Sequence, residues 1–199
     1  MRFVSWNVNG IRAAVKKDFK VSLEVMQPDI LCIQETKAQD DQVAEALAGI
    51  EGYRIYTNSA VKKGYAGTAI LSKREPLAVR LDMGIEQHDQ EGRITALEFD
   101  EFFLVTVYTP NSGSELKRLA YRQDWDAAFL AYLEDLQKEK PVVACGDFNV
   151  AHKPMDLARP KPNYNKSAGY MQVEIDGMDN IVAADFIDTY RFKNPDTVK

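Results

Sequence analysis

Two short, almost uninterrupted apolar runs constrain the fold of this chain more than any other feature. One covers residues 29–34 (Asp-Ile-Leu-Cys-Ile-Gln) and the other covers residues 141–145 (Pro-Val-Val-Ala-Cys). Runs without polar alternation are typical of strands that are covered on both faces. Such strands require a further layer on either side of their sheet. The sequence therefore predicts an α/β or α+β layered domain.

Helical and strand-like segments alternate along the rest of the chain. We expect helices over residues 11–26, 40–48, 114–137 and 178–187, where apolar residues recur near a helical period. We expect further strands over residues 2–6, 53–57, 66–72, 93–99 and 102–108, the last two forming a hairpin. Residues 153–172 are polar and proline-rich and have no strong period. Because no linker or internal repeat interrupts this order, we expect one domain over residues 1–199.

Composition excludes several classes of protein. No apolar run approaches the roughly 20 residues that a membrane helix needs, and residues 1–6 do not resemble a signal peptide. The formal net charge of −5 argues against a general nucleic-acid coat, although a local basic groove remains compatible with it. Cys32 and Cys145 each lie inside an apolar run. We therefore expect two buried thiols in a reducing cytosol rather than a disulfide. We also expect a cytoplasmic monomer that does not bind membranes.

Polar side chains stand at the ends of four predicted strands, where an apolar core has no need of them. They are Asn7, Glu35, Tyr108 with Asn111, and Asp147 with Asn149. Taken singly, each is more often a turn residue, a helix cap or a helix-start charge. Together they indicate a site, because ligands of layered α/β folds lie at strand ends. Carboxylates and amides converging there suit Mg²⁺, and a second carboxylate could act as a base for water.

Several motifs occur in a fixed order and give a strong resemblance. They are Ser-Trp-Asn-Val-Asn-Gly-Ile-Arg at 5–12, Gln-Glu-Thr-Lys at 34–37, Gly-Tyr-Ala-Gly-Thr-Ala at 64–69, Gly-Arg at 92–93, Tyr-Thr-Pro-Asn at 108–111, Gly-Asp-Phe-Asn-Val-Ala-His at 146–152 and Asn-Lys-Ser-Ala-Gly at 165–169. From residue 2 to about residue 191 the chain resembles the exonuclease III family of apurinic/apyrimidinic endonucleases, within the endonuclease/exonuclease/phosphatase superfamily.

The resemblance implies a fold and an activity. The implied fold is a four-layer α/β sandwich of two packed mixed sheets with outer helices, its C-terminal part missing from this chain. The implied reaction is Mg²⁺-dependent hydrolysis of a DNA phosphodiester 5′ to an abasic site, with Mn²⁺ as a possible substitute for Mg²⁺. The implied partner is double-stranded DNA with an abasic site or a 3′ end, because 3′–5′ exonuclease or 3′-end trimming often accompanies the reaction in this family.

The resemblance also implies a role for each polar strand end. Glu35 is the main metal carboxylate and Asn7 helps to hold the metal or its waters. Asp147 orients or deprotonates the attacking water, and Asn149 supports Asp147 and the phosphate, so that both complete the metal set. Tyr108 positions the scissile phosphate or donates a hydrogen bond to it.

Contacts with DNA are implied for a wider group of residues. They are Arg12, Lys17, Gly64, Tyr65, Asn111, Lys153, Arg159, Lys161 and Lys166. Without the resemblance, the basic stretch from 153 to 166 would be interpreted as a solvated loop. Contacts of this kind give affinity and register rather than sequence readout.

One departure from the family pattern leaves other functions open. The family's late strands, with an Asp and a terminal His, do not follow Arg191 in this sequence. A non-catalytic fragment that still binds DNA is therefore one alternative. A phosphatase or an RNA nuclease on the same scaffold is another, although the Tyr-Thr-Pro-Asn and Asn-Lys-Ser-Ala-Gly segments favour the DNA branch.

Overall fold

A computed structural model describes residues 1–198. The chain forms two compact units. The first unit comprises residues 1–109 and 136–148 and contains all the strands. The second unit comprises residues 110–135 and the chain from residue 149 onward, and it is built from helices and turns. No helix among residues 1–198 is long and apolar enough to cross a membrane. The single domain expected from the sequence stays a prediction.

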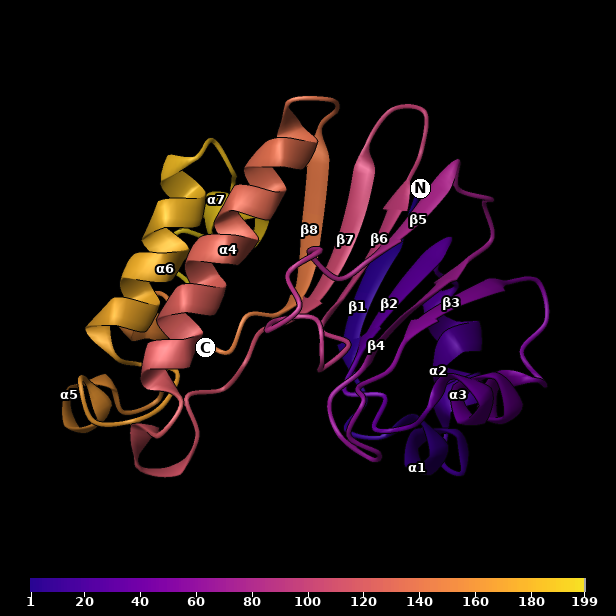
Figure 1. The fold of residues 1–199 in the computed structure, drawn as a ribbon, viewed down its shortest axis with the longest axis horizontal. Coiled ribbons are helices and arrows are strands. Elements are labelled where there is room, and N and C mark those ends of the chain that lie inside the picture. The colour runs from indigo at the N-terminus through magenta and orange to yellow at the C-terminus, as the bar shows by residue number, and fades with distance from the viewer. Residues whose placement is uncertain (199) are drawn as a thin grey trace. The chain divides into compact units, whose positions relative to one another are not determined.

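The first sheet of the first unit has the strand order β1-β2-β4-β3 (Figure 1). Its strands are β1 (Phe3–Asn7), β2 (Ile30–Gln34), β3 (Arg54–Asn58) and β4 (Thr68–Ser72). The β1 and β2 strands are parallel, whereas β4 runs antiparallel to both β2 and β3, so the sheet is mixed. Because β1 and β2 are parallel, their carboxyl ends lie side by side, with Asn7 opposite Gln34.

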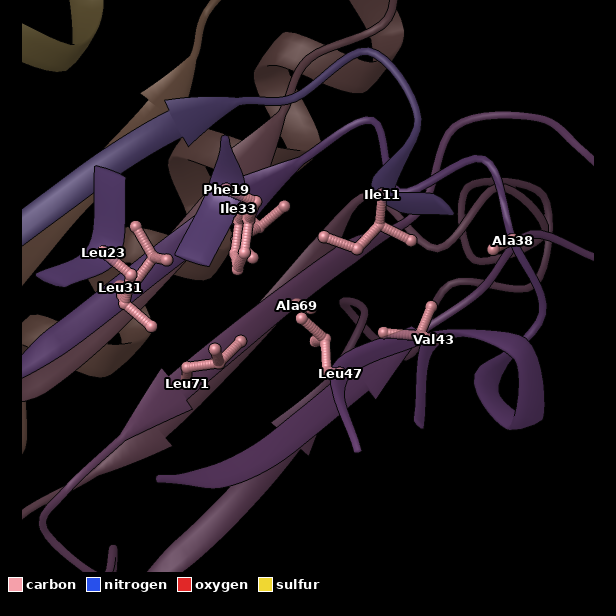
Figure 2. Packing of buried hydrophobic residues seen from close by; sticks show 10 residues of the cluster. All are labelled: Ile11, Phe19, Leu23, Leu31, Ile33, Ala38, Val43, Leu47, Ala69 and Leu71. Atoms are coloured by element: carbon pink, nitrogen blue, oxygen red, sulfur yellow. The ribbon is translucent and has the colours of Figure 1, made fainter. Parts of the chain in front are cut away.

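Three helices cover the outer face of this sheet. They are α1 (Ile11–Val15), α2 (Phe19–Met26) and α3 (Asp40–Leu47). Figure 2 shows the packing of ten buried side chains from these helices, from β2, from β4 and from the segment before α3, among them Phe19, Leu31, Leu47 and Leu71. Burying a Leu or Phe side chain contributes about 1.5–3 kcal/mol. This cluster therefore fixes the helices, and the loops between them, against the carboxyl ends of β1 and β2.

The second sheet of the first unit has the order β5-β6-β7-β8. Its strands are β5 (Ala78–Leu81), β6 (Ile94–Glu98), β7 (Phe103–Tyr108) and β8 (Val142–Asp147). The β6 and β7 strands form the expected antiparallel hairpin. The β7 and β8 strands are parallel, with Tyr108 opposite Asp147. This parallel pair again brings two carboxyl ends to one edge of a sheet.

The two sheets pack face to face, which explains the apolar run at 29–34. In β2, Leu31 and Ile33 join the cluster beneath the helices. Ile30 and Cys32 point to the opposite face, where they pack with residues of the second sheet such as Leu104. Successive side chains of a strand alternate between faces, and both faces of β2 are covered. The predicted α/β sandwich of two mixed sheets with outer helices is confirmed.

Polar pairs also cross between the two sheets. Gln34, which is 1% exposed, donates from Nε2 to Thr106 Oγ1 of β7 at 2.8 Å and to Ser5 Oγ of β1 at 3.1 Å. Thr68 and Thr95 share a hydrogen bond of 2.9 Å between their hydroxyl oxygens. Buried polar groups need such partners, and these pairs are satisfied in only one alignment of the sheets. They therefore fix how the two sheets align.

The second unit contains the long helix α4 (Leu119–Gln137), whose last two residues belong to the first unit. Its other elements are the 3₁₀ turns η1 (Ser114–Leu116) and η2 (Pro154–Asp156) and the helices α5 (Pro160–Asn163), α6 (Gln172–Ala183) and α7 (Thr189–Lys193). Trp125 and Phe129 of α4 stack with ring centroids 5.1 Å apart, and both side chains are buried. The amphipathic helix predicted over 114–137 is therefore present, although it begins as a 3₁₀ turn.

Several predicted boundaries are wrong. The helix expected over 11–26 is broken at residues 16–18, so α1 and α2 have separate axes that each bury a face. The helix expected over 178–187 corresponds to α6, which begins earlier, at Gln172. It begins there because the buried side chain of Glu174 accepts a hydrogen bond from the Met171 amide. Strand β5 and helix α7 were not predicted.

Burial differs from prediction at two places. The run at 141–145 lies in β8, an edge strand that is only partly buried, with Val143 36% exposed. Cys145 of that strand is accordingly half-buried, whereas Cys32 is fully buried, and both thiols are free. His88 lies in an acidic stretch, Glu86-Gln87-His88-Asp89, that is typical of an exposed turn, but it is 3% exposed.

Candidate active site

Four polar side chains converge in the first unit, at the carboxyl ends of the parallel pairs β1–β2 and β7–β8. Asn7 ends β1, Glu35 directly follows β2, Tyr108 ends β7 and Asp147 ends β8. Each parallel pair therefore contributes two of the four groups. These are residues that the sequence predicted to converge, and the fold brings them together because parallel neighbours end at the same edge.

Asn7 joins the two carboxylates. Its Nδ2 donates to Glu35 Oε1 at 2.9 Å and to Asp147 Oδ2 at 2.9 Å. Its Oδ1 accepts from the backbone amide of Asn9 at 3.1 Å, which fixes the orientation of the amide group. One side chain of the first sheet thereby holds a carboxylate from each sheet at a set position.

Lys37 and Asn9 complete the surroundings of Glu35. Lys37 Nζ lies 2.6 Å from Glu35 Oε2 and donates to Asn9 Oδ1 at 2.5 Å. Glu35, Lys37 and Asn9 all have positive φ angles, of 57°, 47° and 48°. Non-glycine residues rarely adopt this conformation, and such strained positions concentrate at functional sites. Lys37 lies in the Gln-Glu-Thr-Lys motif, but no role was predicted for it.

Two glycines permit the close approaches that position the carboxylates. Gly146 has a φ of +149°, and a Cβ there would lie 1.9 Å from the carbonyl oxygen of Val107. Gly67 has a φ of +85°, and a Cβ there would lie 2.2 Å from Thr36 Oγ1. Any larger residue would push β8 from β7, or the segment after β2 from the loop before β4. Asp147 and Glu35 would then move apart.

The electrostatics keep Glu35 charged and Tyr108 protonated. Burial pushes the pKa of Glu35 upward, but hydrogen bonds from Asn7, Lys37 and Tyr108 outweigh it and hold that pKa below its usual value. Burial raises the pKa of Tyr108, and its hydrogen bond to Glu35 raises it further. Tyr108 is therefore an O–H donor beside an ionised carboxylate at neutral pH.

The donor set fits a hard divalent cation. Within residues 1–198 no three His, Cys, Asp or Glu residues cluster as a closed metal cage. Glu35 and Asp147 instead offer carboxylate oxygens in a partly open site, and Asn7 turns its amide nitrogen toward them. The Lys37 ammonium already stands beside Glu35, where a cation would bind. Mg²⁺ binds through one or two carboxylates and keeps several waters, so it suits an open site of this kind.

The second unit holds the other two predicted amides. Asn111 Nδ2 donates to Asn149 Oδ1 at 3.2 Å, and Asn149 has a φ of 48°. The buried guanidinium of Arg122 donates to the carbonyl oxygens of Pro110 at 2.9 Å and Asn149 at 3.2 Å. The structure thus pairs Asn111 with Asn149, a contact that was not predicted, and Asn149 follows Asp147 by two residues in the chain.

The residues predicted to contact DNA are mostly exposed. In the first unit, Arg12 and Lys17 are exposed, and Arg12 donates to the carbonyl oxygen of Lys37 at 3.3 Å. Gly64 and Tyr65 lie in the loop between β3 and β4, with Lys62 Nζ 5.2 Å from the Tyr65 ring centroid. The basic side chains of the second unit predicted to bind DNA are also exposed; these are Lys153, Arg159, Lys161 and Lys166. Their contact with DNA stays a prediction.

Known proteins resemble this chain over almost its whole length. The profile of the Endonuclease/Exonuclease/phosphatase family matches residues 4–197. An exodeoxyribonuclease from Bacillus subtilis is 49% identical over 197 residues, covering 98% of this chain and 77% of the relative. The DNA repair nuclease APEX1 from Danio rerio is 45% identical over 198 residues, covering 98% of this chain and 64% of the relative.

Solved structures agree with these relatives. The structure of an AP endonuclease from Archaeoglobus fulgidus has a TM-score of 0.83 and 27% identity, covering 99% of this chain and 76% of that one. The named relatives are phosphodiester hydrolases, all longer than this chain. Because the family profile and these relatives match almost the whole chain, the chain belongs to the endonuclease/exonuclease/phosphatase family, in its exodeoxyribonuclease and AP endonuclease branch.

Proposed function

We propose that this chain hydrolyses DNA phosphodiester bonds 5′ to abasic sites, with trimming of 3′ ends, and that it uses Mg²⁺ or, as a substitute, Mn²⁺. The observation that carries the proposal is the bridge from Asn7 to Glu35 and Asp147. It places two carboxylates from different sheets on one amide, beside a protonated phenol. The names of the relatives support the DNA substrate and the repair role.

The chain's own groups divide the work of hydrolysis. Glu35, which Asn7 holds in place, would bind the Mg²⁺, and this ion when bound supplies a Lewis acid for a phosphate oxygen. Asp147 accepts a proton from the attacking water, since it is the second carboxylate of the site. The Tyr108 hydroxyl donates to a phosphate oxygen and stabilises the charge that develops there. Lys37 neutralises Glu35 before the cation binds.

DNA is held through its backbone in this proposal. Arg12, Lys17 and the Gly64–Tyr65 loop serve from the first unit. Asn111 and the basic residues between 153 and 166 serve from the second unit. Phosphate contacts of this kind set register, and abasic DNA is selected by its deformability and by an extruded sugar. The protein acts on DNA as a monomer.

An incision assay tests the proposal. A labelled duplex with one abasic site is incubated with the chain, with Mg²⁺ or EDTA, and products are separated on a denaturing gel. We expect incision that EDTA abolishes and that Mn²⁺ restores. Glu35→Ala and Asp147→Asn should each abolish it, while Glu45→Ala and Asp41→Asn, exposed acids on α3, should leave it unchanged.

A native gel, an RNA substrate and a substrate with a terminal phosphate distinguish the competing functions. Retarded migration on a native gel without incision would overturn the proposed hydrolysis and leave a DNA-binding protein. Cleavage of RNA, or release of inorganic phosphate, in place of abasic-site incision would point to another reaction of the family. Wild-type turnover by Glu35→Ala or Asp147→Asn would overturn the assigned roles.

A further inference from the structure

Arg93 is a buried cation that the proposed chemistry does not use. It precedes β6 and is 2% exposed. Its Nε donates to Glu91 Oε2 at 2.7 Å, its Nη1 to the Tyr108 carbonyl oxygen at 2.7 Å and its Nη2 to the Tyr65 hydroxyl at 3.2 Å. Burying a charge is costly unless it is paired and hydrogen-bonded, and here each nitrogen of the guanidinium has a partner. An Arg whose three nitrogens all have hydrogen-bond partners restricts the positions of the groups that it contacts.

Tyr108 is the residue that Arg93 holds most extensively. Besides the side-chain bond to its carbonyl oxygen, the Tyr108 amide donates to the Arg93 carbonyl oxygen at 2.9 Å. The Arg93 Cζ lies 4.8 Å from the centroid of the Tyr108 ring, within the range of a cation–π contact. One side chain therefore holds both the backbone and the ring of a tyrosine that hydrogen-bonds to Glu35.

The backbone at Arg93 is itself fixed by its neighbour. Gly92 has a φ of +57°, and a Cβ there would lie 2.5 Å from the carbonyl oxygen of Asn58. This close approach seats Gly92 against residues 58–60, at the start of the loop that carries Tyr65. The guanidinium reaches that loop again through the Tyr65 hydroxyl. Arg93 thus connects the loop between β3 and β4 with the end of β7.

We propose that Arg93 is a positioning residue that holds the Tyr108 ring in its orientation toward Glu35 and couples it to the Tyr65 loop. The proposal deepens the proposed function, because it rests on Tyr108 acting on the scissile phosphate. Lysine cannot replace arginine fully, since it lacks the planar fork that meets Glu91, Tyr108 and Tyr65 together. The contribution of Arg93 is therefore geometric and not only electrostatic.

Fluorine NMR tests the positioning without requiring turnover. 3-Fluorotyrosine is placed at position 108, and its resonance is compared in the parent chain, Arg93→Met, Arg93→Lys and Arg80→Met. Arg80 is the matched control, because its Cζ also lies 4.8 Å from an aromatic centroid, that of Phe103, and it pairs with Glu98. We expect one narrow resonance in the parent and in Arg80→Met, and a shifted, broadened or divided resonance in Arg93→Met. An unchanged resonance in Arg93→Met overturns the proposal.

Kinetics then test the consequence for catalysis. A displacement of about 1 Å can lower turnover on the order of 100-fold, so kcat should fall about 10- to 100-fold in Arg93→Met, with KM changing much less. Arg93→Lys should recover part of kcat. If Arg93→Met fails to fold by circular dichroism, Arg93→Lys carries both readouts. A parent chain without incision would refute the proposed function, and the fluorine resonance would still decide whether Arg93 positions Tyr108.

Discussion

Replacing Asn7 by Asp turns the hydrogen-bond bridge into a repulsive contact. The two bonds that Asn7 donates, each 2.9 Å long, go to carboxylate oxygens, and bonds to charged groups contribute roughly 1.5–3 kcal/mol each. The site is partly open, so the lower end of that range applies. A carboxylate at position 7 would repel those of Glu35 and Asp147, which costs about 1 kcal/mol at a water-like dielectric. A stronger repulsion would be relieved because one of the three carboxyl groups would take up a proton. We expect Asn7→Asp to lose about 2–4 kcal/mol of unfolding free energy in EDTA.

Urea unfolding with and without a divalent cation measures this loss. A ligand at 100 times its Kd stabilises a protein by about 2.7 kcal/mol, and three carboxylates should bind Mg²⁺ more tightly than two. Mg²⁺ should therefore recover more stability in Asn7→Asp than in the parent chain. Asn180→Asp, which adds the same charge at an exposed position of α6, should stay within about 0.5 kcal/mol of the parent. Equal stability of Asn7→Asp and the parent in EDTA, or an equal response to Mg²⁺, would refute the reasoning.

Other positions give independent tests. Gly146→Ala should cost at least about 3 kcal/mol in a chemical melt, because its Cβ would meet a neighbouring carbonyl oxygen at 1.9 Å, whereas Gly49→Ala, with nothing within 4 Å, should be neutral or slightly stabilising. Burial raises the pKa of Asp82 to about 6, so the folded state binds its proton more tightly and stability should fall as pH rises from about 4 to 6. Asp82→Asn should flatten that part of a stability–pH curve, and an unchanged slope would contradict the assignment. Gln34→Leu should lose about 1–3 kcal/mol in urea, because Thr106 and Ser5 lose their buried partner; a loss of less than 0.5 kcal/mol would mean that the sheets realign.

Strands with a strong apolar signal were predictable, and weak edge strands were not. The run at 29–34 identified β2, since both of its faces are buried. Strand β5 has only four residues and a half-exposed face, and nothing in Ala-Val-Arg-Leu distinguishes it from a loop. The run at 141–145 predicted a strand but not its exposure, because position within a sheet is decided by pairing with other strands.

The candidate site was predictable as a set of residue types, but its connections were not. Polar groups at strand ends indicated Glu35 and Asp147, and parallel pairing explains why they meet. The bridge through Asn7 depends on how two sheets align, and that alignment is set by buried pairs such as Gln34 with Thr106. Arg93 was visible only as part of a Gly-Arg pair, because its burial and its contacts depend on tertiary packing.

The hydrogen bond between Asn7 and Asp147 spans 140 residues of chain. A ribosome makes the strands of the first sheet, which end at Ser72, well before it makes β8. A growing chain therefore contains every residue of the first sheet and of its helices while Asn7 and Glu35 still lack their counterpart. Contacts of such long sequence separation form late in folding as well. The order of synthesis thus delays assembly of the carboxylate pair until most of this chain has been made, and a nascent chain cannot act on nucleic acid through this site before then.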